Sequence, residues 1–225
     1  MLARRWFTKQ LFCAIAALAM TIAGGCGSQD TELPTANLVG SYRVAPDTKQ
    51  FERLRFNQCP EVQVHTSAGD FTVLLDGVKA PLTVDNFLAY AQSGYYDGTI
   101  FHQLYDGFIL LGGGFDVQMH SKPTHSTVRN EAHNGLKNHR YAVAMARQAD
   151  AIDSASSQFF INLADNTSLD YVDSSADKYG YCVFGEVTDG KEVIDKIASG
   201  EVHRSGNFEN VPVHPVVIES IRRVK

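Results

Sequence analysis

Two segments of the chain contain residue types that could bind a phosphate or take part in catalysis. The glycine run Gly112–Gly114 follows an apolar segment, as a phosphate-binding loop would, but neither the lysine nor the glycine spacing of such loops accompanies it. A tight backbone crossing explains the run better. Asp153 stands beside three serines, which suggests a nucleophile with an orienting acid, yet loop polarity accounts for the same residues (Ser154, Ser156 and Ser157).

Four histidines in one polar segment raise the question of a metal site. Their spacings match no recognised ligand set, and the surrounding residues are typical of an exposed loop, so a metal centre is the alternative and a solvated loop the favoured interpretation. These residues are His120, His125, His133 and His139. The usual hydrolase, nucleotide, zinc-protease and redox signatures (GxSxG, GxxxxGK[ST], HExxH and CxxC) do not occur in the sequence. We therefore expect no metal and no cofactor.

The composition is that of an ordinary globular protein. Of 225 residues, 44% are hydrophobic and 20% charged, which excludes disordered and multi-span membrane classes. The net charge of −5 argues against a nucleic-acid partner. Residues 59–225 supply enough chain for one domain with a sizeable core.

The apolar pattern after residue 58 predicts a mainly β domain with two helices. Alternating apolar residues on either side of 67–70 indicate a β-hairpin, with Val62 and Val64 facing Phe71, Val73 and Leu75. A helix is expected over 81–94, with Thr83 as its cap and Gly94 as its end, and a second one over 191–199. Further strands are expected at 108–111, 141–145, 159–163, 181–187 and around 216–221. Such a set favours an antiparallel barrel or sandwich with helices at its ends.

The first 25 residues have the features of an export signal. They contain Arg4, Arg5 and Lys9 with no acidic residue, followed by the uncharged run 11–23, which is too short to span a membrane. The segment 23–26 (AGGC) resembles a bacterial lipobox, in which Cys26 would carry the lipid. The paired arginines resemble a twin-arginine signal, and a plain cleaved signal or a mitochondrial-type leader is the remaining alternative.

Residues 26–58 are polar and predict a tether between a membrane and the domain. With Cys13 in the leader and Cys26 in the lipobox, two cysteines remain in an oxidising compartment, Cys59 and Cys182. The sequence leaves open whether they form a disulfide or stay as two thiols.

Several segments in order resemble the cyclophilin family. The run 101–115 (FHQLYDGFILLGGGF) is similar to the family block FHRxxPGFxxQGGxF, and three shorter segments are similar to its SMA, SQFFI and VFGxV segments. The segment 130–136 (NEAHNGL) further resembles the periplasmic bacterial branch. The shorter segments are 144–147 (AMAR), 157–161 (SQFFI) and 183–187 (VFGEV).

The resemblance implies a closed eight-stranded antiparallel barrel capped by two α-helices, and peptidyl-prolyl cis-trans isomerase activity without cofactors. It also implies a site. Gln103, Phe108 and Gln158 take the catalytic positions, and Phe108, Ile109, Phe160 and Leu169 form the proline pocket, with Leu111 alongside. The backbone of Ala146 and Arg147 would hold the peptide, with His102 and Tyr181 at the rim.

The departures from the family pattern fall on the catalytic positions. The family's arginine is Gln103 here, its glutamine partner is Leu111, and the aromatic residue beside the pocket is Ser168. Ile109 replaces a methionine of similar volume. We therefore expect an exported, monomeric isomerase of reduced activity. It would act on proline-containing segments of unfolded envelope proteins at the periplasmic face of a bacterial membrane. The alternatives are a proline-peptide-binding module without catalysis and, further off, a structural or metal-binding envelope protein.

Overall fold

The computed structural model describes residues 58–224. The expected leader at 1–25, its lipobox and nearly all of the 26–58 tether lie outside the described residues. The described part is built mainly of strands, with two α-helices and two short 3-10 helices, η2 (Ala132–Asn134) and η3 (Thr167–Leu169).

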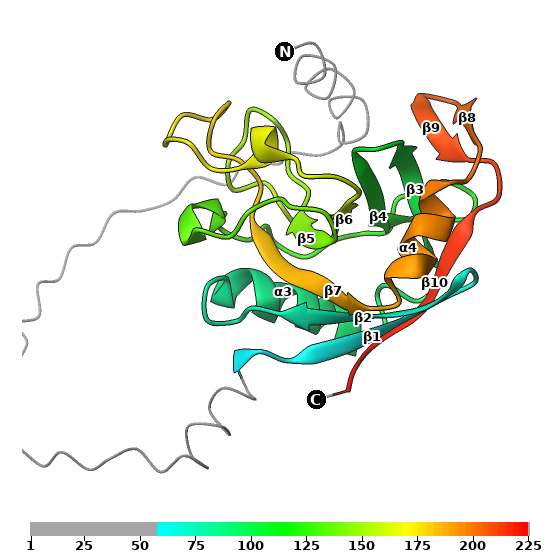
Figure 1. Cartoon of the computed structure of the whole chain (residues 1–225), viewed down its shortest axis with the longest axis horizontal. Helices are drawn as coiled ribbons and strands as arrows, with labels where there is room; N and C mark the ends of the chain where they lie inside the picture. Colours follow the sequence, from blue (N-terminus) through cyan, green and yellow to red (C-terminus); the bar gives the residue numbers. More distant parts are fainter. Residues whose placement is uncertain (1–57, 225) are drawn as a thin grey trace, which may run out of the picture.

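Eight strands close into a barrel in the order β1-β10-β3-β4-β6-β5-β7-β2, and every neighbouring pair is antiparallel (Figure 1). Closure leaves the sheet without an open edge. The fold class expected from the sequence is therefore confirmed. The barrel strands are β1 (Glu61–Thr66), β2 (Gly69–Leu75), β3 (Thr99–Tyr105), β4 (Ile109–Asp116), β5 (Ala142–Met145), β6 (Phe159–Asn162), β7 (Val183–Asp189) and β10 (Val216–Arg223).

The predicted hairpin forms with the expected inward residues. Val62 of β1 lies opposite Val73 of β2, and Val64 lies opposite Phe71. All four side chains are at most 3% exposed and belong to the main apolar cluster, which fills the barrel interior. Side chains alternate across a strand, so the register of this one hairpin decides which residues enter the core.

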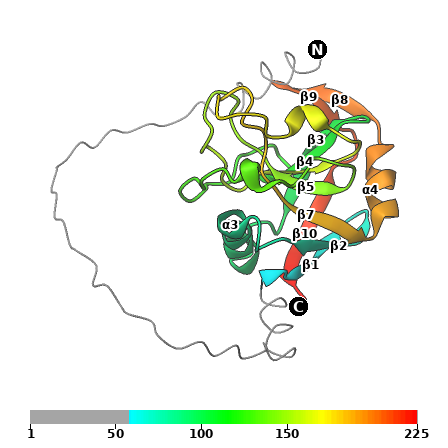
Figure 2. The ribbon, with the colours of Figure 1, turned by 60° about the vertical axis from the view of Figure 1, so that its left-hand side comes forward.

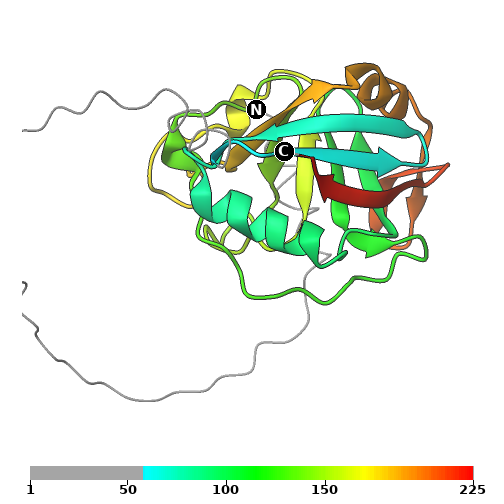
Figure 3. The ribbon, with the colours of Figure 1, turned by 90° about the horizontal axis from the view of Figure 1, so that it is seen from below.

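Helix α3 (Pro81–Gln92) contributes Phe87 to an aromatic cluster of the core. The ring of Phe87 packs against those of Tyr96, Phe159 and Phe184 at centroid distances of 5.2, 5.5 and 5.1 Å. Gly94 follows the helix with φ +69°, a left-handed conformation in which a side chain is unfavourable. Figure 3 shows α3 lying along one side of the barrel, as the apolar spacing of its sequence predicts.

The prediction that Thr83 caps α3 is wrong. The N-cap position is Ala80, and Thr83 lies inside the first turn with its side chain buried. The carboxylate of Glu131, from a distant loop, accepts bonds from the Thr83 backbone N–H at 2.9 Å and its hydroxyl at 2.7 Å, and from the Leu82 N–H at 3.2 Å. A negative charge at this end favours the helix, so the loop supplies the cap.

Helix α4 (Lys191–Ala198) lies on another side of the barrel from α3 (Figure 2). Ile194 and Ile197 are buried in the main cluster, as the sequence pattern predicts. Gly190 precedes the helix with φ +76°, and a Cβ there would lie 2.5 Å from the carbonyl oxygen of Asp70. Neither α-helix of the described part combines the length and the hydropathy that a membrane crossing requires.

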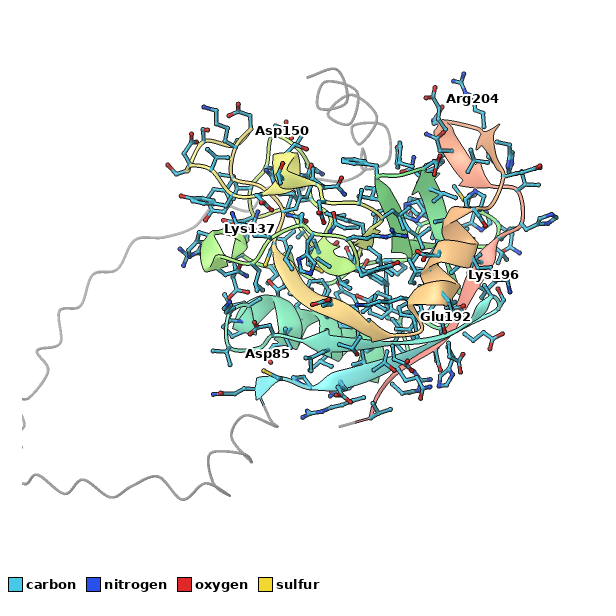
Figure 4. All side chains as sticks on the ribbon, in the orientation of Figure 1. Asp85, Lys137, Asp150, Glu192, Lys196 and Arg204 are labelled. Atoms are coloured by element: carbon cyan, nitrogen blue, oxygen red, sulfur yellow. The ribbon has the colours of Figure 1, made fainter. Side chains whose placement is uncertain are left out.

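A two-stranded hairpin that the sequence did not predict joins α4 to the last barrel strand. It consists of β8 (Val202–Ser205) and β9 (Phe208–Pro212), paired antiparallel. The hairpin stands beside β3 (Figure 1). Its tip carries Arg204, whereas Lys137 and Asp150 are on loops at the other side of the barrel (Figure 4).

Cys182 is a free, buried thiol, so the disulfide that the sequence left open is not formed. Its Sγ lies 3.4 Å from the Thr83 hydroxyl, next to the Glu131 carboxylate that caps α3. Burial raises the pKa of the Cys182 thiol to about 11. The thiol is therefore protonated at neutral pH and is a packing residue.

Candidate active site

A second apolar cluster lies on the outer face of the barrel, separate from the interior core. It contains seven of the residues assigned to the site from the sequence. Four are fully packed members of this pocket cluster, Tyr181 joins them at 9% exposure, and Phe108 and Ala146 pack against them while half-buried. The four are Ile109, Leu111, Phe160 and Leu169.

Strand pairing brings these side chains to one face. Leu111 of β4 lies opposite Phe160 of β6, which in turn lies opposite Ala144 of β5. Directly paired residues share a face of the sheet, so the three form a row across the strands. The neighbouring residues Leu110 and Ile161 point the other way, into the interior core. Leu111 thus packs as an apolar residue, as expected for a chain without the family's arginine.

A buried polar ladder, which the sequence did not reveal, holds the edge of this cluster. The amide of Asn166 donates to the Phe108 carbonyl at 2.8 Å and to the Asn162 side chain at 2.8 Å. Asn162 donates to Asn138, whose backbone and side chain both donate to Asp170. Of these asparagines only Asn162 interrupts an apolar segment (159–163, FFINL), so it alone has a signal in the sequence. The ladder fixes the backbone on which Phe108 and Leu169 stand.

Arg147 is 4% exposed, and its guanidinium is bonded to backbone of its own molecule. It donates to the carbonyls of Gly180, Gln148, Ala149 and Ala176. Burial lowers its pKa from the ordinary value. The same group lies 5.0 Å above the ring of Tyr181, which packs edge-on against Phe160 at 5.7 Å.

Gln158 lies over the glycine run. A Cβ at Gly114 would come within 2.6 Å of the Gln158 Cγ, so this glycine admits the glutamine side chain. Gly113 has φ +80° and packs against Phe159 and Tyr96. The run therefore lies close against side chains of neighbouring segments, and a backbone atom, the Ile100 carbonyl oxygen, comes near only at Gly112. The Gln158 side chain is half-buried and forms no hydrogen bond with any other residue of 58–224, so its amide is available to a bound peptide.

Gln103 is held by two acceptors on its own molecule. Its Nε2 donates to the hydroxyl of Tyr105 at 3.0 Å and to the backbone carbonyl of Glu209, in β9, at 3.3 Å. Only 6% of its surface is exposed. The β8–β9 hairpin that supplies Glu209 borders a cavity of about 470 Å³, which also reaches the end of α4 and contains no residue of the pocket cluster.

The rim position expected for His102 is wrong. A β-bulge between Phe101 and Gln103 interrupts the alternation of β3, and the His102 ring is 1% exposed. It packs at 4.6 Å from the Phe115 ring and at 6.2 Å from that of Phe208, away from the pocket cluster. Its Nδ1 has no hydrogen-bond partner within 58–224.

Burial lowers the pKa of His102 from 6.5 to about 3, which predicts an acid-sensitive fold. Between these two values the unfolded chain binds a proton that the folded protein does not, so stability falls as the pH drops through this range. The contribution reaches about 1.4 kcal/mol per pH unit. We expect His102→Leu to flatten the pH dependence of urea unfolding between pH 6.5 and 4. Parallel curves for the variant and the wild type would contradict this expectation.

The four histidines considered as metal ligands lie apart. His120 pairs with Asp116 and His139 with Glu186, while His125 packs on Tyr90 and His133 packs near Tyr171. Within 58–224, His, Cys, Asp and Glu side chains do not gather in threes suited to a metal ion.

The closed eight-stranded antiparallel barrel with its two helices is the fold of a class of protein, the proline isomerases of cyclophilin type. The family model described as cyclophilin type peptidyl-prolyl cis-trans isomerase matches residues 61–223. The chain belongs to this family, and is accordingly a peptidyl-prolyl cis-trans isomerase by descent.

Individual relatives are consistent with this family assignment. The chain is 48% identical to the peptidyl-prolyl cis-trans isomerase cyp18 of Streptomyces antibioticus, over 72% of this chain and 96% of the relative. It is also 48% identical to the peptidyl-prolyl cis-trans isomerase B of Escherichia coli, over 71% and 97%. A crystal structure of a Cryptosporidium parvum cyclophilin type isomerase, solved in the presence of the dipeptide Ala-Pro, is similar with a TM-score of 0.60. It is 26% identical and covers 73% of this chain and 99% of that one.

Proposed function

We propose that this protein is an exported, lipid-anchored isomerase that acts on X-Pro bonds of envelope proteins, with lower turnover than relatives that carry the arginine. The pocket cluster carries the proposal, because it gathers aromatic and branched side chains on the outer face of the barrel with the half-buried ring of Phe108 packed against them, and a proline ring binds among side chains of this kind. Gln158, with its amide available, would hold the peptide backbone beside it.

Proline isomerisation makes and breaks no covalent bond. The X-Pro amide turns through a state that has lost its resonance, against a barrier of about 18–20 kcal/mol. An apolar surface favours the twisted amide, whose charge separation is smaller than that of the planar form. A hydrogen bond to the prolyl nitrogen stabilises the lone pair that appears on twisting, and this interaction is stronger in the transition state than in the ground state.

The reduced rate follows from Gln103. A charge-assisted bond contributes about 1.5–3 kcal/mol and a neutral one about 0.5–1.5, so the exchange loses about 1–2 kcal/mol of transition-state stabilisation. Since about 1.4 kcal/mol corresponds to a factor of ten, the deficit is about 5- to 30-fold if Gln103 donates to the peptide, and larger while both of its N–H groups stay bonded to Tyr105 and Glu209.

Export and anchoring rest on the leader and the lipobox at Cys26. The test is metabolic labelling with a fatty acid in a bacterial host, comparing the wild type with Cys26→Ser. We expect the wild type to be labelled and recovered with membranes, and the variant to be unlabelled. A wild type that stays unlabelled and soluble in the periplasm would remove the anchor from the proposal, and one found in the cytoplasm would remove export as well.

The second candidate is a proline-peptide-binding module, and the engagement of both Gln103 donors by Tyr105 and Glu209 favours it. A solvent-jump assay on a short Ala-Pro-Phe peptide decides between the two. We expect the wild type to accelerate the cis-to-trans conversion above the buffer rate. Buffer-level rates with intact peptide binding, measured by titration, would establish the binding module.

A further inference from the structure

The cavity of about 470 Å³ lies where the end of α4 meets the β8–β9 hairpin and the end of β3. Its walls are both apolar and acidic. Leu104, Ala198 and Val202 contribute apolar surface, and Asp106 and Glu201 contribute carboxylates. Among the described residues that line the cavity, none is basic. The cavity therefore has two kinds of surface that a single ligand would have to match.

The protein leaves the negative charge of this cavity unpaired. Asp106 and Glu201 are exposed, and neither carboxylate forms an ion pair or a hydrogen bond with another residue of 58–224. Helix α4 ends at Ala198, and the C-terminal end of a helix carries partial negative charge. The last lysine of α4, Lys196, donates to the Ala68 carbonyl at 3.2 Å. The cavity therefore favours a ligand that carries a positive charge.

An organic cation suits the cavity better than a metal ion. Calcium takes six or more oxygen ligands, whereas two carboxylates line this cavity. Within 58–224, no group of three His, Cys, Asp or Glu side chains is placed to share a metal ion. A lysine or arginine side chain combines an apolar stem with a charged end, so it matches both the apolar walls and the carboxylates. The side chain of Asn210, which also lines the cavity, adds an amide oxygen that can accept.

The cavity and the pocket cluster share a turn of the chain. Residues 105–108 form this turn, which is closed by a bond from the Phe108 N–H to the Tyr105 carbonyl at 2.9 Å. Asp106, inside the turn, lines the cavity, and Phe108, at its end, packs against the pocket cluster. Two residues span at most about 7 Å. A peptide that places its proline against Phe108 therefore reaches the cavity with a residue two or three positions away.

A second connection runs through β9. Asn210 lines the cavity, and the carbonyl of the preceding residue, Glu209, accepts the bond from Gln103 at 3.3 Å. Gln103 occupies the position that the family resemblance assigns to catalysis. The cavity thus adjoins the candidate active site on two strands, β3 and β9, and is placed to receive part of a substrate that the site holds.

We propose that this cavity is a specificity subsite for a lysine or arginine side chain of the substrate, two or three residues from the proline. This inference rests on the proposed function, because the proline pocket holds another part of the same peptide. Asp106 and Glu201 attract the charged end, and the apolar walls receive the methylene stem. Proline segments with a basic residue at this distance then bind more tightly than neutral ones.

Peptides that differ in one side chain test the subsite on the full-length wild type. The probes are Ala-Pro-Phe peptides extended with alanine, which carry lysine, norleucine or glutamate two or three positions before or after the proline. In at least one placement we expect a Kd for the lysine peptide about two- to fivefold lower than for norleucine, the size expected of an exposed ion pair. The preference should shrink at about 1 M salt. Equal Kd values for lysine and norleucine in every placement would overturn the proposal.

Variants assign the preference to the two carboxylates. Asp106→Asn and Glu201→Gln should each reduce the lysine preference, their combination should abolish it, and Glu201→Lys should favour the glutamate peptide instead. Asp85→Asn is the matched control, since it removes the same charge from α3, away from the hairpin (Figure 4). The chain has a net charge of −5, so this control measures the general attraction of a basic peptide. A preference that survives in the double variant, or that falls equally in Asp85→Asn, would overturn the subsite.

The inference and the proposed function fail separately, because the Kd measurements do not depend on turnover. A wild type that accelerates isomerisation but binds the lysine and norleucine peptides equally would overturn the subsite and leave the isomerase proposal standing. A wild type that prefers lysine in the Kd, with isomerisation at the buffer rate, would support the subsite as part of a peptide-binding module and overturn the isomerase.

Discussion

The double substitution Gln103→Arg with Leu111→Gln should raise kcat/KM by about 5- to 30-fold. The gain equals the difference of about 1–2 kcal/mol between a charge-assisted and a neutral hydrogen bond to the transition state. Gln103 and Leu111 are directly paired across β3 and β4, so Leu111→Gln places an acceptor beside the new guanidinium. The measurement is the solvent-jump assay on the Ala-Pro-Phe peptide.

Each substitution alone should change the rate little. Gln103→Arg leaves the guanidinium beside an apolar Leu111, which is 1% exposed, so its acceptors are the Tyr105 hydroxyl and the Glu209 carbonyl that already bind Gln103, and neither aims it at a peptide. Gln103→Lys with Leu111→Gln is the matched control, because lysine brings the charge without the planar fork of donors. If Gln103→Arg combined with Leu111→Gln leaves kcat/KM unchanged, the loss of the arginine and its glutamine partner is not the cause of the reduced activity.

Phe108→Ala should lower kcat/KM by about 10- to 100-fold while the fold is retained. Burying a ring against a phenylalanine contributes about 1.5–3 kcal/mol, and the alanine removes that wall of the pocket. Phe108 is half-buried and its backbone is held by the Leu163 N–H and by Asn166, so the truncation affects the pocket more than the core.

The measurements are the isomerisation rate, the peptide Kd and the melting temperature. Tyr171→Ala is the control, as a half-buried aromatic residue that packs outside the pocket cluster. An unchanged rate in Phe108→Ala would show that proline binds elsewhere on the barrel. A loss matched by Tyr171→Ala would indicate general destabilisation.

Regular alternation of apolar and polar residues along the chain made much of the barrel predictable. The inward set of the first hairpin and the buried faces of both helices follow from local periodicity, and the structure has them. The β8–β9 hairpin was missed because its first strand is short and largely exposed, which leaves no apolar period to detect. The rim position of His102 rests on the family resemblance, and the β-bulge between Phe101 and Gln103 accompanies a ring that packs against Phe115 instead.

Contacts between distant parts of the chain account for the other features that the sequence did not predict. The cap of α3 comes from Glu131, 48 residues from Thr83, and Gln103 bonds Glu209, 106 residues away. No local propensity encodes such pairs. Family resemblance pointed to residues that the structure brings into one apolar cluster, but the roles it implies belong to a site with an arginine, where this chain has Gln103.

The interior core and the pocket cluster are separate sets of side chains on opposite faces of the same strands. Substitutions in the pocket cluster therefore leave the contacts of the interior core in place. The stability that they cost is confined to the packing of the outer cluster itself, whose members are nearly as buried as those of the core.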